Sequence, residues 1–327
     1  MTSQHPSQPA APSRARIVIL LLVALLCGAG VALQSRINGQ LGGELGDGSL
    51  AAVISFGSGL IVTIVALLVS RSGRDGLGTV VREVRARRFP WLFLLGGLGG
   101  GFFVLSQGIT VGVIGVALFT VAAVAGQTIS GLVIDARGIG TVAPKRVTVW
   151  RLVGSVIALA AVIISVGPEV QRNSPLWMLL MPFVVGLLLG WQQAFNGQVK
   201  TLAKSAITAT FINFVGGTLL LIVAAAINLG VVGWPKTFPT NPLLYVGGVI
   251  GVIFIAGFAV VIPVIGVLLQ SLAAVAGQLI MSLILAIVAP TSAATLTATT
   301  IVGTVLTLAG VAIASVPSRR RATALVE

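Results

Sequence analysis

The chain has 327 residues, of which 56% are hydrophobic and only 8% are charged, and its formal net charge is +13 at pH 7. In a soluble globular protein about a quarter of all residues are charged, because the surface must contact water. The composition therefore excludes a large soluble enzyme, a disordered chain and a collagen-like repeat, and predicts a protein whose main solvent is lipid.

The first 16 residues are polar, and we expect them to form a disordered cytoplasmic tail. Arg14 and Arg16 precede the first apolar run, a pattern that can also mark a cleaved signal peptide. This run has a partner later in the chain, which favours a retained helix. Cys27 is the only cysteine, and Leu26 before it does not suit lipoprotein cleavage.

Ten apolar runs follow, and about 20 such residues are needed for a helix to cross a bilayer. The runs show no two-residue alternation, so they predict an all-α integral membrane protein rather than a β-barrel. The third and fourth runs are separated only near Gly108 to Gly115, and the eighth and ninth only near Pro263, so each pair is expected to form a tight hairpin. The runs span residues 17–38, 49–69, 91–110, 112–134, 149–167, 176–196, 206–228, 243–262, 264–289 and 297–316.

The basic residues predict the orientation of these spans. If the amino terminus is cytoplasmic, all but three of the 20 Lys and Arg fall in segments on the inner side; the exceptions are Arg36, Arg172 and Lys236. Such a bias predicts ten spans in the plasma membrane with both termini cytoplasmic. The segment from Arg71 to Arg88 holds six arginines, which either enforce this topology or bind anionic lipid.

The two halves of the chain are repeats of each other. The segment from Gln34 to Gln40 matches the one from Gln192 to Gln198 at an offset of 158, and Ala122–Gln127 is identical to Ala273–Gln278 at an offset of 151. Because each half holds five spans, an odd number, the second half must enter the membrane inverted. We therefore expect a first repeat at residues 17–167, an external linker at 168–175, a second, inverted repeat at 176–316 and a cytoplasmic tail at 317–327.

These features resemble the YdcZ-type branch of the drug/metabolite transporter superfamily. The resemblance rests on the Gln-x-x-x-Asn-Gly end of the first helix, on a Phe-x-x-Gly in the second and on the Ala-Ala-Val-Ala-Gly-Gln helix, in both halves. It implies an inverted-repeat fold of ten helices around a central cavity, and transport of small metabolites or drugs. The first span lacks the Glu on which small multidrug transporters of the same superfamily depend, so their proton-coupled exchange is not implied.

Polar side chains inside spans are costly and identify candidate site residues. Gln127 and Gln278 lie well inside their helices in the same local sequence. They are either a symmetric pair that lines the cavity and binds a polar substrate, or residues that hold helices together by hydrogen bonds.

Two further pairs, Gln34 with Asn38 and Gln192 with Asn196, have the i, i+4 spacing that places both side chains on one helix face. Because the repeats are inverted, one pair is expected near each mouth of the cavity. The alternative for the Asn residues is a helix end, because each precedes a glycine. Asn213, whose counterpart is Ser55, lies about a third of the way into the seventh span, while Gln107 and Gln270 lack amide counterparts and are weaker candidates. The ring of Trp191 could bind a cationic or aromatic substrate or simply pack in the bundle.

Acidic residues give little support for proton coupling, because none is expected at mid-depth and only Glu44, in the first external loop, is a candidate. We expect no cofactor and no metal, since the single His5 and Cys27 form no ligand set. We expect no nucleic acid partner either. An uncharged cavity favours a neutral or zwitterionic substrate, because a bare ion would find no opposite charge there.

The sequence thus predicts a secondary transporter, not an enzyme, that moves a small organic molecule by alternating access. The alternative is a flippase for a lipid-linked substrate. Either protein is expected to act as a monomer of fused repeats or as a homodimer.

Overall fold

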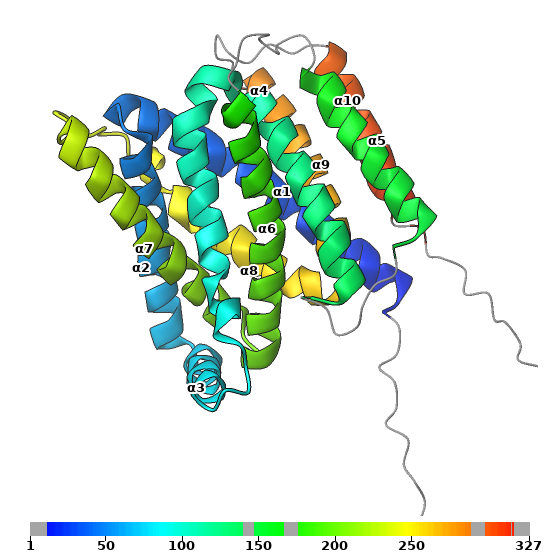
Figure 1. Cartoon of the computed structure of the whole chain (residues 1–327), viewed down its shortest axis with the longest axis horizontal. Helices are drawn as coiled ribbons and strands as arrows, with labels where there is room; N and C mark the ends of the chain where they lie inside the picture. Colours follow the sequence, from blue (N-terminus) through cyan, green and yellow to red (C-terminus); the bar gives the residue numbers. More distant parts are fainter. Residues whose placement is uncertain (1–11, 140–146, 167–175, 289–297, 315, 317–327) are drawn as a thin grey trace, which may run out of the picture.

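The computed structural model describes residues 12–139, 147–166, 176–288, 298–314 and 316, and every regular element in them is a helix (Figure 1). The expected all-α class is confirmed for this part of the chain. Two short 3-10 helices, η1 (Trp91–Leu95) and η3 (Pro242–Tyr245), precede α4 and α8. The α-helices are α1 (Arg14–Leu45), α2 (Gly48–Val69), α3 (Arg71–Arg85), α4 (Gly96–Arg137), α5 (Val149–Val166), α6 (Leu176–Ala203), α7 (Ala206–Val232), α8 (Gly247–Ile265), α9 (Val267–Val288) and α10 (Ala298–Ala314).

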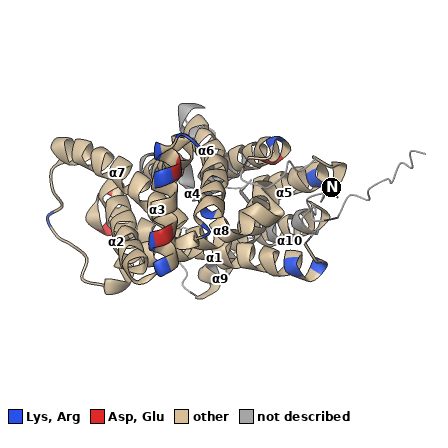
Figure 2. Ribbon diagram, turned by 90° about the horizontal axis from the view of Figure 1, so that it is seen from below, with Lys and Arg blue, Asp and Glu red and all other residues tan. Residues whose placement is uncertain are grey.

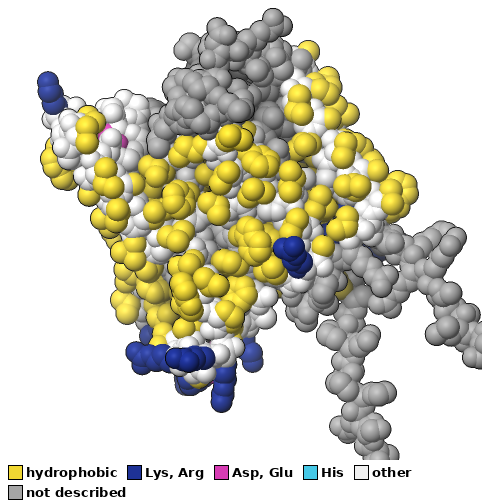
Figure 3. All heavy atoms as spheres, in the orientation of Figure 1, with side chains coloured by type: hydrophobic (Ala, Val, Ile, Leu, Met, Phe, Trp, Pro, Cys, Tyr) yellow, Lys and Arg dark blue, Asp and Glu magenta, His cyan; other side chains and the backbone are white. Residues whose placement is uncertain are grey.

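Several helices are suited to a lipid environment. Five in the described residues are long and apolar enough to cross a membrane, namely α1, α2, α7, η3 with α8, and most of α9, and shorter apolar helices lie in α4, α5 and α10. Large apolar side chains are exposed on the outside, among them Leu68 at 65%. Figure 3 shows hydrophobic side chains over much of the described part of one face. A surface of this kind is stable in lipid and unfavourable in water. The number of ten spans stays a prediction.

The helix α4 turns back on itself, although its helical geometry continues over 42 residues. A straight helix of that length would be about 63 Å long, so its two ends could not contact the same place. Gly96 near one end lies against Asn196 of α6, however, and Ile134 near the other end packs in one cluster with Ala194 of α6. The chain therefore reverses between these ends, and Figure 1 shows a cyan and a green limb beside α6. The reversal agrees with the expected hairpin, but the non-helical break expected near residues 108–115 is absent.

The hairpin of the second half has a true break. It lies at Gly266, whose φ of +87° is rarely adopted by residues with a side chain. The break was expected near Pro263, which instead lies in the last turn of α8, where a proline restricts the residue before it but leaves the preceding turns helical. Gly115 occupies the equivalent position in the first half, and η1 and η3 are also equivalent at the offset of 151.

Contacts between the two halves occur in pairs. A β-carbon added to Gly97 of α4 would lie 2.0 Å from the carbonyl oxygen of Asn213 on α7. One added to Gly248 of α8 would lie 2.1 Å from the carbonyl oxygen of Ser55 on α2. The glycines differ by 151 positions and their partners by 158, which are the two offsets of the sequence repeat. A contact together with its exchanged copy is what a two-fold axis between the repeats produces.

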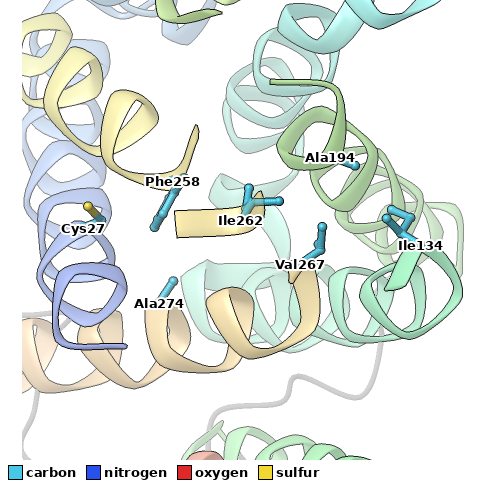
Figure 4. Close-up of a cluster of buried hydrophobic side chains, with 7 residues drawn as sticks. All are labelled: Cys27, Ile134, Ala194, Phe258, Ile262, Val267 and Ala274. Carbon is cyan, nitrogen blue, oxygen red and sulfur yellow. The ribbon is translucent and has the colours of Figure 1, made fainter. Parts of the chain in front are cut away.

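Helices of both repeats share their cores. The rings of Phe56 on α2 and Phe214 on α7, which are equivalent residues, have their centroids 5.2 Å apart. Gly59 faces the ring of Phe214 and Gly217 faces the ring of Phe56, so each glycine makes room for an aromatic side chain of the other repeat. A second cluster, shown in Figure 4, joins α1, α4, α6, α8 and α9 through Cys27, Ile134, Ala194, Phe258, Ile262, Val267 and Ala274.

The sequence did not predict α3, because its arginines concealed a helical pattern. Three residues on one face, Gly73, Gly76 and Val80, are buried at helical spacing, and the rest of the helix is largely polar. The hydroxyl of Ser70 caps its first turn by accepting a hydrogen bond from the N–H of Gly73 at 3.1 Å. In the ribbon of Figure 2, several positions coloured as basic or acidic residues lie along α3.

Two of the expected segment boundaries fall outside the described residues, namely the linker 168–175 and the tail 317–327. The expected amino-terminal tail was too long, because α1 begins at Arg14. The hydroxyl of Ser13 caps this helix by accepting from the N–H of Arg16, so the basic residues expected before the span belong to its first turn.

Candidate functional site

Three amide side chains meet where α6 and α7 pack, and we call Gln192, Asn196 and Asn213 the α6–α7 cluster. The Oδ1 atom of Asn213 accepts hydrogen bonds from Nε2 of Gln192 at 3.0 Å and from Nδ2 of Asn196 at 2.9 Å. All three side chains are buried, and Asn213 is completely so. The i, i+4 spacing on α6 therefore does place both of its amides on one face, toward the same residue of α7.

This cluster leaves hydrogen-bonding atoms unused. Within the part of the chain that the structure describes, Oε1 of Gln192 and Nδ2 of Asn213 are buried and have no hydrogen-bond partner. An unsatisfied buried polar atom costs about 1–3 kcal/mol, so proteins rarely keep one without a reason. One of these atoms is an acceptor and the other a donor, and together they can bind a polar group that offers both.

The equivalent residues of the first repeat, Gln34, Asn38 and Ser55, form the α1–α2 cluster. Nε2 of Gln34 donates to the carbonyl oxygen of Gly247 on α8 at 2.8 Å. Oδ1 of Asn38 and Oγ of Ser55 are buried and have no partner among the described residues. Serine replaces asparagine at the third position, so this cluster lacks the shared amide acceptor of the α6–α7 cluster.

Glycines bring a third helix against each cluster. A β-carbon on Gly96 of α4 would lie 2.8 Å from Oδ1 of Asn196, and one on Gly247 of α8 would lie 2.2 Å from Oδ1 of Asn38. These glycines allow α4 and α8 to approach the candidate amides closely. A side chain at either position would push the helix away from its cluster.

The pair Gln127 and Gln278 lies on either side of a crossing between α4 and α9. Val124 and Val275, which are equivalent residues, pack together in one buried cluster at this crossing. Each glutamine lies three positions further along its helix, about 4.5 Å in the axial direction. Gln127 contacts Ser271 and Gly131 lies against Leu268, so the two helices run antiparallel here and the glutamines lie on opposite sides of the crossing along the bundle.

These two glutamines differ in their surroundings. Gln127 is buried, and its Nε2 donates to Oγ of Ser271 at 3.2 Å, which in turn donates to Oε1 of Gln193 on α6 at 3.1 Å. Gln278 is only half-buried. Gln127 therefore links three helices in the way expected of an interhelical contact, whereas Gln278 keeps an accessible side chain.

Gln270 is one of the weaker candidates from the sequence, and its surroundings make it a stronger one. It lies in the first turn of α9, it is completely buried, and neither Oε1 nor Nε2 has a partner among the described residues. We ranked it low because its equivalent in the first repeat is Phe119, not an amide. Its position inside an apolar run was the feature that could have identified it.

An ion pair between Asp135 and Arg151 was also missed. Nη2 of Arg151 donates to Oδ2 of Asp135 at 2.7 Å, and both side chains are buried. Oδ1 of the same carboxylate accepts from the N–H of Val267 at 2.8 Å, at the first turn of α9. The carboxylate thus caps a helix of the second repeat directly after the break at Gly266.

The two remaining candidates lie in different settings. Trp191 is partly buried, and its ring contacts that of Phe195 edge-on with centroids 5.7 Å apart, within a row of aromatic rings that continues to Phe93. This position matches the packing alternative. Glu44 is exposed in the last turn of α1 and accepts from Nε2 of Gln40 at 3.0 Å. It lies about 9 Å along the helix from Asn38, outside the α1–α2 cluster.

Among the described residues, no group of three or more His, Cys, Asp and Glu side chains could hold a metal ion. The clusters themselves consist of amide and hydroxyl side chains, which are neutral donors and acceptors. Such an arrangement can bind and orient a polar molecule.

Comparison with known proteins agrees with this architecture. A family model described as "Putative inner membrane exporter, YdcZ" matches residues 19–164 and 177–313, which correspond to the two repeats. A solved structure described as "Crystal structure of protein" is similar over 93% of this chain and 97% of that one, with a TM-score of 0.65 and 16% identity. At this identity the similarity shows a shared fold and nothing more. No curated protein matches the sequence.

Proposed function

The chain belongs to the YdcZ family of inner membrane exporters, and from this premise we propose that it moves a small neutral or zwitterionic organic molecule across the cytoplasmic membrane by alternating access. The family makes the protein a membrane transporter rather than an enzyme. The mechanism, the class of substrate and the binding residues are our proposal.

The proposed topology has ten spans with both termini cytoplasmic. The reversal of α4 supports this count, because it supplies the third and fourth spans from one continuous helix. With this topology the α1–α2 cluster lies toward the outside and the α6–α7 cluster toward the cytoplasm. A two-fold axis that exchanges the clusters gives two packings of nearly equal energy that open to opposite sides.

The unused amide atoms are the observation that carries the proposal. Both clusters place buried hydrogen-bonding atoms beside a glycine-lined helix contact that would open when the repeats separate. A substrate that enters at either mouth would satisfy these atoms and recover the cost of their burial. None of the six cluster side chains carries a charge, which favours a substrate without net charge. Gln278, which keeps an accessible amide, would serve between the two mouths.

A ligand screen followed by transport tests this proposal. The purified protein is screened by thermal shift against metabolites and drugs, and each hit is then tested for counterflow in proteoliposomes. A ligand stabilises the folded protein by RT ln(1 + [L]/Kd), so a real substrate raises the melting temperature in a concentration-dependent way. The Gln34→Leu/Gln192→Leu variant should lose both the shift and the counterflow.

The matched control is Gln40→Leu, which removes an exposed amide of α1 outside the clusters. Equal stabilisation of the wild type and the cluster variant would contradict the proposed site. The Gln127→Leu/Gln278→Leu variant shows whether the central pair binds substrate, because loss of counterflow without loss of stability identifies a binding role. Movement of a labelled lipid with no water-soluble hit would favour the flippase alternative.

A further inference from the structure

A groove of about 930 Å³ lies on the outside of the molecule between the end of α2 and α3. Its walls are apolar on the α2 side and carry guanidinium groups on the α3 side. The lining residues are Leu67, Leu68, Arg74, Leu77, Gly78, Val81, Arg82, Arg85 and Ala86.

The position of α3 is fixed by the second repeat. Oγ1 of Thr208 on α7 donates to the carbonyl oxygen of Gly73 at 2.9 Å. Gly76 lies so close to the turn between α6 and α7 that an added β-carbon would be 2.8 Å from the carbonyl oxygen of Ala203. Figure 1 shows α3 nearly end-on while α2 and α7 run up the page, so α3 crosses the ends of the spans. An amphipathic helix in this orientation lies in the plane of a membrane surface.

Positive charge dominates the exposed face of α3. Six arginines and only two carboxylates, Asp75 and Glu83, lie between residues 71 and 88. Asp75 is 3.9 Å from Arg71 in an exposed pair that neutralises little, and the partly buried Glu83 is 3.7 Å from Arg82. Arg74 donates to the carbonyl oxygen of Leu68, which holds its guanidinium at the edge of the groove. The groove therefore has an edge with net positive charge.

The apolar wall of the groove continues the lipid-facing surface. Leu68 and Val69 at the end of α2 are 65% and 80% exposed, and Val81 of α3 is 41% exposed. The side of the groove away from α3 is thus a helix long and apolar enough to cross a membrane. An occupant must match an apolar wall and the arginine side chains that line the same groove. A phospholipid has this combination, and an anionic headgroup completes the charge.

We propose that the groove between α2 and α3 binds an anionic phospholipid, with the acyl chain against Leu67, Leu68, Leu77 and Val81 and the headgroup phosphate at Arg82 and Arg85, which are one helical turn apart. Arg74, about 12 Å from Arg82 along the helix, adds positive charge at the other end of the groove. Guanidinium groups bind phosphate oxygens with two parallel hydrogen bonds. A zwitterionic headgroup also carries a phosphate, but it has no net charge and is attracted less strongly by the arginines. The site belongs to the first repeat alone, because the second repeat has no equivalent of α3 in the described residues.

Native mass spectrometry of the full-length protein in detergent tests this site. Dioleoyl phosphatidylglycerol, dioleoyl phosphatidylcholine and glycerol phosphate are titrated in turn. We expect tight adducts with phosphatidylglycerol only. The Arg74→Gln/Arg82→Gln/Arg85→Gln variant should bind it roughly a hundredfold more weakly, since each arginine near an anionic lipid contributes about fivefold.

Two further variants make the result specific. Gly78→Phe keeps every charge, and hence the topology, but fills the groove, because a β-carbon on Gly78 meets nothing within 4 Å. It should weaken phosphatidylglycerol binding as well. Arg319→Gln/Arg320→Gln/Arg321→Gln removes the same charge from the carboxyl-terminal segment and should leave binding unchanged.

Three outcomes would overturn the proposal. Equal weakening by the two triple variants would mean that only the total charge matters. If phosphatidylcholine bound as tightly as phosphatidylglycerol, the arginines would not form an anion site. Binding of glycerol phosphate as tight as that of the lipid would remove the acyl part of the site.

Discussion

Arg151 neutralises Asp135 within the first repeat, while the same carboxylate caps α9 of the second repeat. The guanidinium lies 2.7 Å from Oδ2, and the N–H of Val267 lies 2.8 Å from Oδ1. The residue of the second repeat equivalent to Asp135 is Ala286, so this connection has no counterpart at the opposite mouth. In the proposed topology it ties the repeats together on the cytoplasmic side only.

Arg151→Gln should destabilise the protein strongly, by about 3–5 kcal/mol, because it leaves a buried carboxylate without its guanidinium. Asp135→Asn should have a similar effect, and the double variant should be much less unstable than the sum of the two, since the residues interact directly. Thermal or chemical unfolding in detergent measures the three values. Arg71→Gln, which breaks an exposed pair, is the control and should change little. Additive effects would show that the pair does not act as a unit.

Alanine at Gly97 or Gly248 should destabilise the contact between the repeats. The new methyl group would lie about 2 Å from a backbone carbonyl oxygen, which the neighbouring helix can relieve only by moving away. Overpacking of this kind costs about 1–3 kcal/mol. Gly57→Ala on α2 is the matched control, because its added carbon meets nothing within 4 Å and alanine favours a helix. Melting temperatures in detergent compare the three, and a loss in Gly57→Ala equal to that in the other two would refute this explanation.

The Asp47 carboxylate, which caps α2, should make stability depend on pH. Partial burial raises its pKa, but hydrogen bonds from the Ser49 hydroxyl and N–H and from the Leu50 N–H outweigh this, and the pKa is lowered overall. A group whose pKa is lower in the folded than in the unfolded protein stabilises above its ordinary pKa, near 3.9, and loses this contribution as the pH falls through the folded value. The stability difference between the wild type and Asp47→Asn should therefore be constant from about pH 7 to 5 and shrink below about pH 4. A stability difference that did not change down to pH 3 would disprove the proposed contribution of the ionised Asp47 carboxylate.

Cysteine labelling can test the ten-span topology. In a Cys27→Ala background, which removes the only cysteine, Lys236→Cys and Ser72→Cys each place a thiol at an exposed position. Lys236 lies outside and Ser72 inside in the proposed topology. A maleimide that cannot cross membranes should label Lys236→Cys in intact cells, and Ser72→Cys only after permeabilisation. Labelling of both thiols in intact cells would refute the topology.

The sequence by itself determined the class of this protein and its internal repeat. Composition and the length of the apolar runs indicate which segments can lie in lipid. Both are properties of residues that are close together in the chain. The two offsets, 158 and 151, were enough to identify equivalent residues, and the contacts of Gly97 and Gly248 follow those offsets. The hairpin in residues 91–134 could also be predicted, because the hairpin in residues 243–289 repeats its sequence.

Only the tertiary structure decided which polar residues meet. Gln127 and Gln278 have identical local sequences, yet Gln127 is buried against Ser271 and Gln193 while Gln278 stays half-buried. The equivalents of Ser271 and Gln193 are Thr120 and Ser35, so the environment differs although the segment does not. The pairing of Asp135 with α9 likewise joins residues more than a hundred positions apart. Such contacts depend on how whole helices cross, and local periodicity carries no information on that.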